Sequence, residues 1–181
     1  MKDNATGSLD RRDFVIASLA TVGASAAFAT AAGGSDAQDK AASPRPTGTV
    51  YTGDLIGGKK VINALDVKDL DPGRKHAFYF QGVQMPTGQH WYVSVLVAKG
   101  AQPGKRIALV SGVHGDEISP VRTIQTVMDQ LDPAEMSGIV LAVLDVSRPA
   151  IEGMSRRWPN SARGIDLIDI NLEWPGNEDG A

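Results

Sequence analysis

Residues 106–117, with the sequence RIALVSGVHGDE, constrain the fold of this chain more than any other stretch. The apolar run at residues 107–111 has the character of a buried strand, and Gly112 ends it. His114 and Glu117 follow three residues apart, immediately before a helical pattern. A turn between a strand and a helix can deliver both side chains to one divalent metal ion.

Residues 118–131 predict a helix, because their apolar side chains recur every three to four positions. Ser119 before Pro120 is a candidate N-cap, and Asp116 is an alternative start for this helix. The continuous apolar run at residues 139–144 predicts a strand buried on both faces. Strand, helix and strand predict a parallel pair with a right-handed crossover, so the loops after both strands open at one sheet edge, where ligands bind.

Two segments upstream predict an antiparallel hairpin. Residues 77–81 are mostly aromatic, residues 90–98 alternate in the manner of a strand, and a Pro-Thr-Gly turn separates them. Residues 51–70 are only weakly patterned. The predicted fold class is therefore α/β: a mixed β-sheet with parallel central strands, an antiparallel leading edge and flanking helices.

Composition excludes several classes of function. The chain is 42% hydrophobic and 22% charged, which suits one globular domain. A net charge of −3 and a pI near 5.6 show that the chain lacks the excess of basic residues that is typical of nucleic-acid-binding proteins. The chain has no cysteine, so any metal ion must be held by histidine, aspartate or glutamate. The three histidines are His76, His90 and His114.

The N-terminus has the pattern of an export signal. Arg11 and Arg12 precede an apolar, small-residue run that ends near position 31, as in twin-arginine signals. We therefore expect residues 1–31 to engage the twin-arginine translocation machinery and to place the protein in the periplasm or outside the cell. An uncleaved membrane anchor is the alternative. Residues 32–48 have the composition of a flexible linker, and residues 49–181 form the predicted domain.

The spacing of His114 and Glu117 leaves two interpretations open. Catalytic zinc sites have three protein ligands and one open position, and this turn supplies two ligands. Alternatively, the histidine is hydrogen-bonded in the turn, and the glutamate lies in the first helical turn, where the helix dipole favours it. The arginines between positions 148 and 163 are similarly ambiguous. They either bind a substrate carboxylate or carbonyl, or lie in a solvated loop.

Four segments carry a resemblance to a known family. They are residues 112–117 (GVHGDE), 145–150 (DVSRPA), 156–159 (RRWP) and 169–176 (DINLEWPG). Together they resemble the succinylglutamate desuccinylase/aspartoacylase family, a branch of the zinc carboxypeptidase superfamily, over roughly residues 77–176. The resemblance implies that His114 and Glu117 are zinc ligands. It also implies that Arg157, with Arg163 as its competitor, stabilises the scissile carbonyl, and that Asn171 binds the substrate.

Two departures from the family pattern affect this expectation. The family has an Asn-Arg pair that holds the substrate carboxylate, whereas this chain has Asn171 followed by Leu172. Losing such a charge-assisted contact costs about 1.5–3 kcal/mol. The family's third zinc ligand is a downstream histidine, and this chain has no histidine after Glu117. We therefore expect residues 49–181 to be the N-terminal part of a metallohydrolase domain, with its general base unassigned.

The expected function is zinc-dependent hydrolysis of an amide bond in a small N-acyl amino acid or peptide, as in deacylases and carboxypeptidases. Two alternatives remain open. One is an exported, non-catalytic ligand-binding module that retains the pocket. The other is an inactive, truncated homologue that does not fold alone.

Overall fold

The computed structural model describes residues 46–159 and 167–176. The predicted signal at residues 1–31, and most of the predicted linker, lie outside these residues. In the described part of the chain, six strands form one sheet in the order β1-β2-β3-β4-β6-β5. The strands are β1 (Val50–Ile56), β2 (Lys59–Ala64), β3 (Arg74–Gln84), β4 (His90–Lys99), β5 (Gln102–Val110) and β6 (Ser137–Val143).

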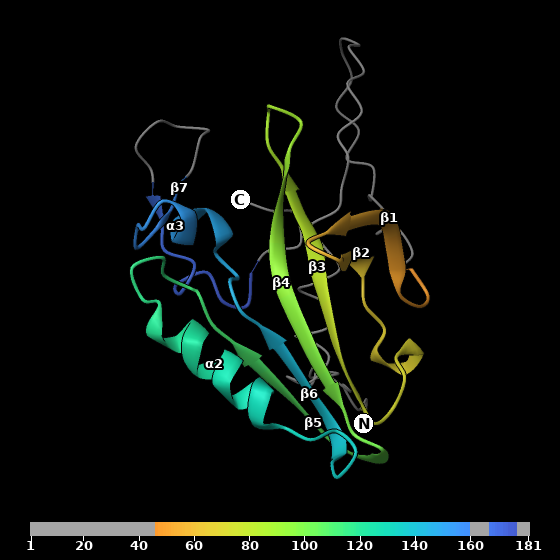
Figure 1. Cartoon of the computed structure of the whole chain (residues 1–181). Helices are drawn as coiled ribbons and strands as arrows, with labels where there is room; N and C mark the ends of the chain where they lie inside the picture. The colour runs from red at the N-terminus through yellow and green to blue at the C-terminus, as the bar shows by residue number, and fades with distance from the viewer. Residues whose placement is uncertain (1–45, 160–166, 177–181) are drawn as a thin grey trace, which may run out of the picture.

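The strand pairing confirms the predicted mixed sheet. β3 and β4 form the antiparallel hairpin, and β5 runs parallel to β6, with Ile107 opposite Val140. β4 joins these two units by pairing antiparallel to β6, while β2 pairs parallel to β3. Figure 1 shows the long β3–β4 hairpin beside the β5–β6 pair. The edge where β5 and β6 end is therefore also the edge where β4 begins.

The first two strands and the short 3-10 helix η1 (Val67–Asp69) lie in the segment that sequence patterning described poorly. β1 pairs with β2 through an irregular register, and most of its side chains are exposed. An exposed strand has no buried face, so it lacks the apolar alternation that identifies a strand from sequence.

The apolar core lies on both faces of the sheet. Helix α2 (Ser119–Gln130) lies along β5 and β6 in Figure 1, and Met128 is its buried side chain. Met128 packs in a cluster with Ala98, Ala142 and Leu144. A second cluster gathers buried side chains of β2, β3, β4 and β6 with one residue that follows η1. Its members are Ile62, Leu70, Phe78, Phe80, Val95, Val97 and Leu141.

The start of α2 differs from the predicted cap. Ile118 is the N-cap residue and has helical backbone angles, whereas Ser119 is the first residue of the helix. No side chain caps this end, so the assignment of Ser119 as the cap was wrong. Pro120 does lie in the first turn, where its missing N–H costs no intrahelical hydrogen bond.

The loops after β5 and β6 meet at one edge, as the parallel pair requires. The N–H of Val146 donates to the carbonyl oxygen of Ser111 at 3.2 Å, and the N–H of Ser147 donates to that of Gly112 at 2.9 Å. The chain continues through α3 (Arg148–Glu152) to a ribbon of two short antiparallel strands, β7 (Trp158–Pro159) and β8 (Leu167–Ile168).

Gly115 allows α3 to pack directly on the turn after β5. A Cβ atom at this position would lie 1.8 Å from the carbonyl oxygen of Ala150. The N–H of Gly115 donates to the carbonyl oxygen of Ser155 at 2.8 Å. Any larger residue would separate these two backbones, so this glycine fixes the position of the turn relative to α3. In the described residues, no helix is long and apolar enough to span a membrane.

Candidate metal centre

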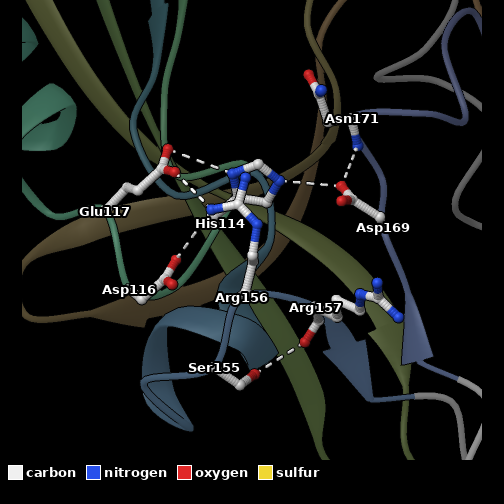
Figure 2. A network of polar contacts seen from close by, with 8 residues as sticks. All are labelled: His114, Asp116, Glu117, Ser155, Arg156, Arg157, Asp169 and Asn171. Atoms are coloured by element: carbon white, nitrogen blue, oxygen red, sulfur yellow. Dashed lines mark hydrogen bonds and ion pairs between the residues drawn. The ribbon is translucent and has the colours of Figure 1, made fainter.

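His114 lies at the centre of a polar cluster at the carboxyl edge of the parallel pair (Figure 2). The turn after β5 buries the residue, which is only 6% exposed. Its Nδ1 atom lies 3.2 Å from Oε2 of Glu117, and its Nε2 atom lies 2.9 Å from Oδ1 of Asp169. Both ring nitrogens therefore face carboxylates that come from different parts of the chain.

Asp169 sets the orientation of the imidazole. Its Oδ1 atom accepts hydrogen bonds from Nε2 of His114 and from the backbone N–H of Asn171, the latter at 3.1 Å. A carboxylate has only acceptor atoms, so in the protonated ring Nε2 donates to Asp169 and Nδ1 donates to Glu117. If the ring loses the Nδ1 proton and keeps the hydrogen bond to Asp169, a lone pair on Nδ1 faces Glu117. The hydrogen bond to Asp169 raises the pKa of His114 and lowers the pKa of Asp169.

Glu117 connects the imidazole to an arginine. Its Oε1 atom accepts a hydrogen bond from Nη1 of Arg156 at 2.7 Å, and the same nitrogen lies 3.9 Å from Oδ1 of Asp116. Arg156 is the main cause of the lowered pKa of Glu117, followed by His114. The Glu117 side chain is 50% exposed, so its carboxylate is accessible from solvent.

The donor set suits a divalent metal ion. Two ligand atoms on one tetrahedral zinc ion lie about 3.3 Å apart, given bonds of about 2.0–2.1 Å. The 3.2 Å between Nδ1 of His114 and Oε2 of Glu117 fits that spacing. A carboxylate that accepts the second ring N–H is the usual support of a metal-binding histidine. Three carboxylates against one guanidinium also leave a formal charge of −2 to attract a cation, counting Asp116, Glu117, Asp169 and Arg156.

The described residues contribute fewer than three converging ligands. Across residues 46–159 and 167–176, no group of three or more His, Asp or Glu side chains is arranged to hold a metal ion. His76 and His90 are not ligands of this centre. Their ring nitrogens bond to the backbone carbonyl oxygens of Asp71 and Gly82, at 2.9 and 3.1 Å.

The predicted arginines have different surroundings. The backbone carbonyl of Arg157 accepts a hydrogen bond from the Ser155 hydroxyl at 2.8 Å. Its guanidinium makes no ion pair with any residue that the structure describes, and Figure 2 shows it turned away from His114. Arg163 lies outside the described residues. The predicted substrate-binding residue Asn171 is next to Asp169, and its side chain is exposed.

Sequence reasoning did not single out Asp169 or Arg156. Both lie in segments that carried the family resemblance, so the signal was present. Asp169 precedes Asn171 by two residues, and Arg156 is adjacent to Arg157. Adjacent arginines cannot be assigned different contacts from composition alone, because the backbone turn between them decides which one reaches Glu117.

The comparisons with known proteins bear on the family resemblance. Residues 103–181 match the model of the succinylglutamate desuccinylase/aspartoacylase catalytic domain. A solved structure described as a succinylglutamate desuccinylase/aspartoacylase from Rhodobacter sphaeroides is 29% identical, with a TM-score of 0.51 over 62% of this chain and 34% of that chain. The resemblance to the succinylglutamate desuccinylase/aspartoacylase family is confirmed.

A second structure supports the family fold alone. It is the product-bound structure of the ectoine utilization protein EutE (DoeB) from Ruegeria pomeroyi, at 18% identity and a TM-score of 0.51. The match covers 76% of this chain and 36% of that chain. The chain thus spans about a third of the length of these two family structures. The search of curated proteins found no match.

Proposed function

We propose that this chain binds zinc through His114 and Glu117 and belongs to an enzyme that hydrolyses an amide bond in an N-acyl amino acid or peptide. The observation that carries the proposal is the 3.2 Å approach of Nδ1 of His114 to Oε2 of Glu117, with Nε2 held by Asp169. The relationship to a family of desuccinylases and aspartoacylases supports the reaction class.

The residues of this chain have separate roles in metal binding and substrate orientation. His114 and Glu117 would hold the ion, and Asp169 keeps the proton on Nε2 so that Nδ1 is free to bind. The chemistry that a bound zinc ion supplies is polarisation of the scissile carbonyl and a lowered pKa, about 7, of the attacking water. Asn171 would orient the substrate through its exposed amide.

Arg156 has the best position for stabilising the negative charge that develops on the carbonyl oxygen. Its guanidinium lies 2.7 Å from Glu117, beside the predicted metal position. A preorganised cation at this place lowers the barrier of amide hydrolysis. The corresponding role of Arg157 or Arg163, predicted from the family resemblance, stays a prediction. A larger loss of kcat in Arg157→Ala or Arg163→Ala than in Arg156→Ala would show that one of those two arginines, and not Arg156, stabilises the charge on the carbonyl oxygen.

Zinc titration of the purified full chain tests the metal centre. Wild-type protein, stripped with a chelator, is expected to bind one zinc ion per chain by calorimetry. His114→Ala and Glu117→Ala should lose that binding. His90→Ala is the matched control, because His90 bonds to a backbone carbonyl in the hairpin and should leave zinc affinity unchanged. Equal zinc binding by wild type and His114→Ala would refute the proposal.

A second candidate function is a ligand-binding module without catalysis. The absence of a third converging ligand in the described residues favours it. In that case an N-acyl amino acid would bind equally well with and without chelator, and no variant of His114 would change its affinity. Zinc-dependent release of the free amino acid would exclude this function.

We propose in addition that residues 1–31 direct export through the twin-arginine route. The support is the Arg11-Arg12 pair before the apolar run. Cell fractionation of the tagged full chain should show it outside the cytoplasm, and the double substitution Arg11→Lys and Arg12→Lys should retain it inside. Lys2→Gln serves as the control. Unchanged export of the double variant would contradict this route.

A further inference from the structure

A pocket lies between the start of β4 and helix α3. The tip of the β3–β4 hairpin extends beyond the neighbouring strands, and α3 contacts β4 at this end of the sheet (Figure 1). The pocket has a volume of about 240 Å³, and its lining includes Met85, His90, Tyr92, Arg148 and Glu152. The described lining includes no residue of the metal centre. Sites for drug-sized ligands measure about 300–1,000 Å³, so this pocket suits a smaller molecule.

An irregularity in the hairpin sets the orientation of His90. The register of β3 and β4 shifts between Gln81 and Gln84, opposite the start of β4. Within this shift, Nδ1 of His90 lies 3.1 Å from the carbonyl oxygen of Gly82. A carbonyl oxygen only accepts hydrogen bonds, so Nδ1 carries the proton and Nε2 of the neutral ring has a free lone pair. None of the described residues donates a hydrogen bond to that nitrogen. Such bulges commonly redirect a side chain beside a functional site.

Aromatic rings and a thioether form the apolar part of the pocket. The ring centroid of Tyr92 lies 6.4 Å from that of His90 and 6.4 Å from that of Tyr79. His90 and Tyr92 are two positions apart on one strand, so their side chains project from the same face of the sheet. The face of an aromatic ring attracts a cation within about 6 Å of its centroid. The flexible side chain of Met85 accommodates an apolar group of variable shape.

Glu152 supplies a carboxylate opposite these rings. Its Oε1 atom accepts a hydrogen bond from Nε of Arg148 at 2.6 Å, whereas Oε2 has no partner among the residues that the structure describes. The side chain is 43% exposed, so this second oxygen is accessible. Arg148 also pairs with Asp145, at 2.8 Å. Two carboxylates against one guanidinium leave a formal charge of −1, which attracts a cation and repels an anion.

We propose that this pocket is a second ligand site, separate from the metal centre, which binds a primary ammonium group that carries a small apolar or aromatic group. The ammonium has three N–H donors, and it donates to Oε2 of Glu152 and to Nε2 of His90. The attached group packs on Tyr92 and Met85. The inference goes beyond the proposed function, because it requires neither zinc nor hydrolysis of an amide.

NMR titration of the isotope-labelled full chain, with a chelator present, tests the site with benzylamine and benzyl alcohol. The two probes have the same ring and similar size, but only the amine is charged at neutral pH. Wild type is expected to bind benzylamine about fivefold or more tightly than the alcohol, the range for a cation–π contact with an ion pair. Glu152→Gln should lose this preference. Glu135→Gln, at an exposed glutamate in the loop before β6, is the matched control and should keep it.

Substitutions of Tyr92 test the aromatic contact independently of Glu152. Tyr92→Leu should weaken the binding of benzylamine by about threefold or more, whereas Tyr92→Phe keeps the ring and should bind like wild type. The backbone resonances that shift should belong to residues 85–92 and 148–152. Shifts centred on residues 114–117 would overturn the proposal, because they would place the amine at the metal centre.

Four further results would overturn it. They are no saturable binding of benzylamine by wild type, equal affinity of wild type for the amine and the alcohol, an unchanged preference in Glu152→Gln, or an equal loss of preference in Glu135→Gln. The last result would show that the amine responds to the net charge of the surface and not to this pocket. Since zinc is absent from every titration, these outcomes are independent of the zinc binding that tests the proposed function.

Discussion

Two charged clusters lie at the same edge of the sheet and use the same kinds of side chain. Asp145, after β6, accepts hydrogen bonds from the N–H and hydroxyl of Ser94 and from Arg148, at 2.5, 3.1 and 2.8 Å. Glu117, after β5, accepts one from Arg156 and faces His114. Asp145 is 7% exposed, whereas the Glu117 side chain is 50% exposed.

The Asp145 cluster is a structural ion pair, whereas the His114 cluster is a candidate binding site. The Asp145 cluster is saturated from within, so it ties β4 to α3 and offers little to a ligand. In the His114 cluster, an imidazole nitrogen of a buried histidine lies 3.2 Å from a carboxylate oxygen of an accessible glutamate. Removing a member of the first cluster should therefore change stability, and removing a member of the second should change binding.

The substitution Gly115→Ala is expected to have the largest effect, because it should disturb both clusters. Gly115→Ala places a methyl group against the backbone of Ala150, so α3 must move away from the turn. We expect a loss of about 3 kcal/mol in unfolding free energy and a large loss of zinc affinity. Urea unfolding and zinc titration measure the two effects. Gly153→Ala, in the same segment but with a nearest contact of 3.2 Å, is the control. A Gly115→Ala variant with wild-type stability would show that α3 does not pack on the turn.

The substitution Asp145→Ala should have the next largest effect, and it should lower the free energy of unfolding without changing zinc affinity. Asp145→Ala leaves Arg148 and the N–H of Ser94 without their shared partner, and breaking such a pair costs about 3 kcal/mol. Chemical denaturation should show this loss, while the folded variant keeps its zinc affinity. A parallel fall of zinc affinity and stability would show that the Asp145 cluster and the His114 cluster are coupled, not separate.

A smaller effect is expected from the residue that orients His114. Asp169→Ala should lower zinc affinity by roughly 10–100-fold, the usual range for a carboxylate that supports a metal-binding histidine. Calorimetric titration gives the value. Asp116→Ala is the matched control, because among the described residues Asp116 pairs with Arg156, at 3.9 Å, and not with His114. An Asp169→Ala variant with wild-type zinc affinity would show that Asp169 does not support His114 as a zinc ligand.

The smallest effect is a pH dependence in zinc-free protein. The pKa of His114 is raised in the fold, so protonated His114 stabilises the protein below its ordinary pKa of 6.5, and this contribution is lost as pH rises through the folded pKa. Glu117 and Asp169 have lowered pKa values, so their contributions are lost at acidic pH. The stability difference between wild type and Asp169→Ala should therefore shrink on going from about pH 6 to about pH 9. A difference that grows over this range would contradict the assigned contacts.

Much of the fold was predictable because burial leaves a periodic pattern. The helix at residues 118–131 packs part of its apolar face on the sheet, and the strand at residues 139–144 is mostly buried. Both form within one or two residues of the expected boundaries. β1 and β2 were missed, because β1 exposes most of its side chains and β2 follows no clean alternation. Ser119 had the residue type of a cap, but Ile118 already has helical backbone angles.

The site was only half predictable, for a different reason. His114 and Glu117 belong to one turn, so their spacing is visible in a single segment. Asp169 and Arg156 reach that turn from irregular chain, and only the tertiary hydrogen bonds select them. Sequence motifs located both segments, but not which of two adjacent arginines turns toward the glutamate.

The separation of His114 from Asp169 has a consequence for synthesis. The two residues are 55 positions apart, so the histidine leaves the ribosome roughly 3 to 11 s before the carboxylate that orients it, at about 5–20 residues per second. During that interval the imidazole can exchange its proton between both nitrogens. An ion that arrives early meets an unoriented ligand, and the nascent chain acquires its full selectivity for metal only after residues 167–176 have docked.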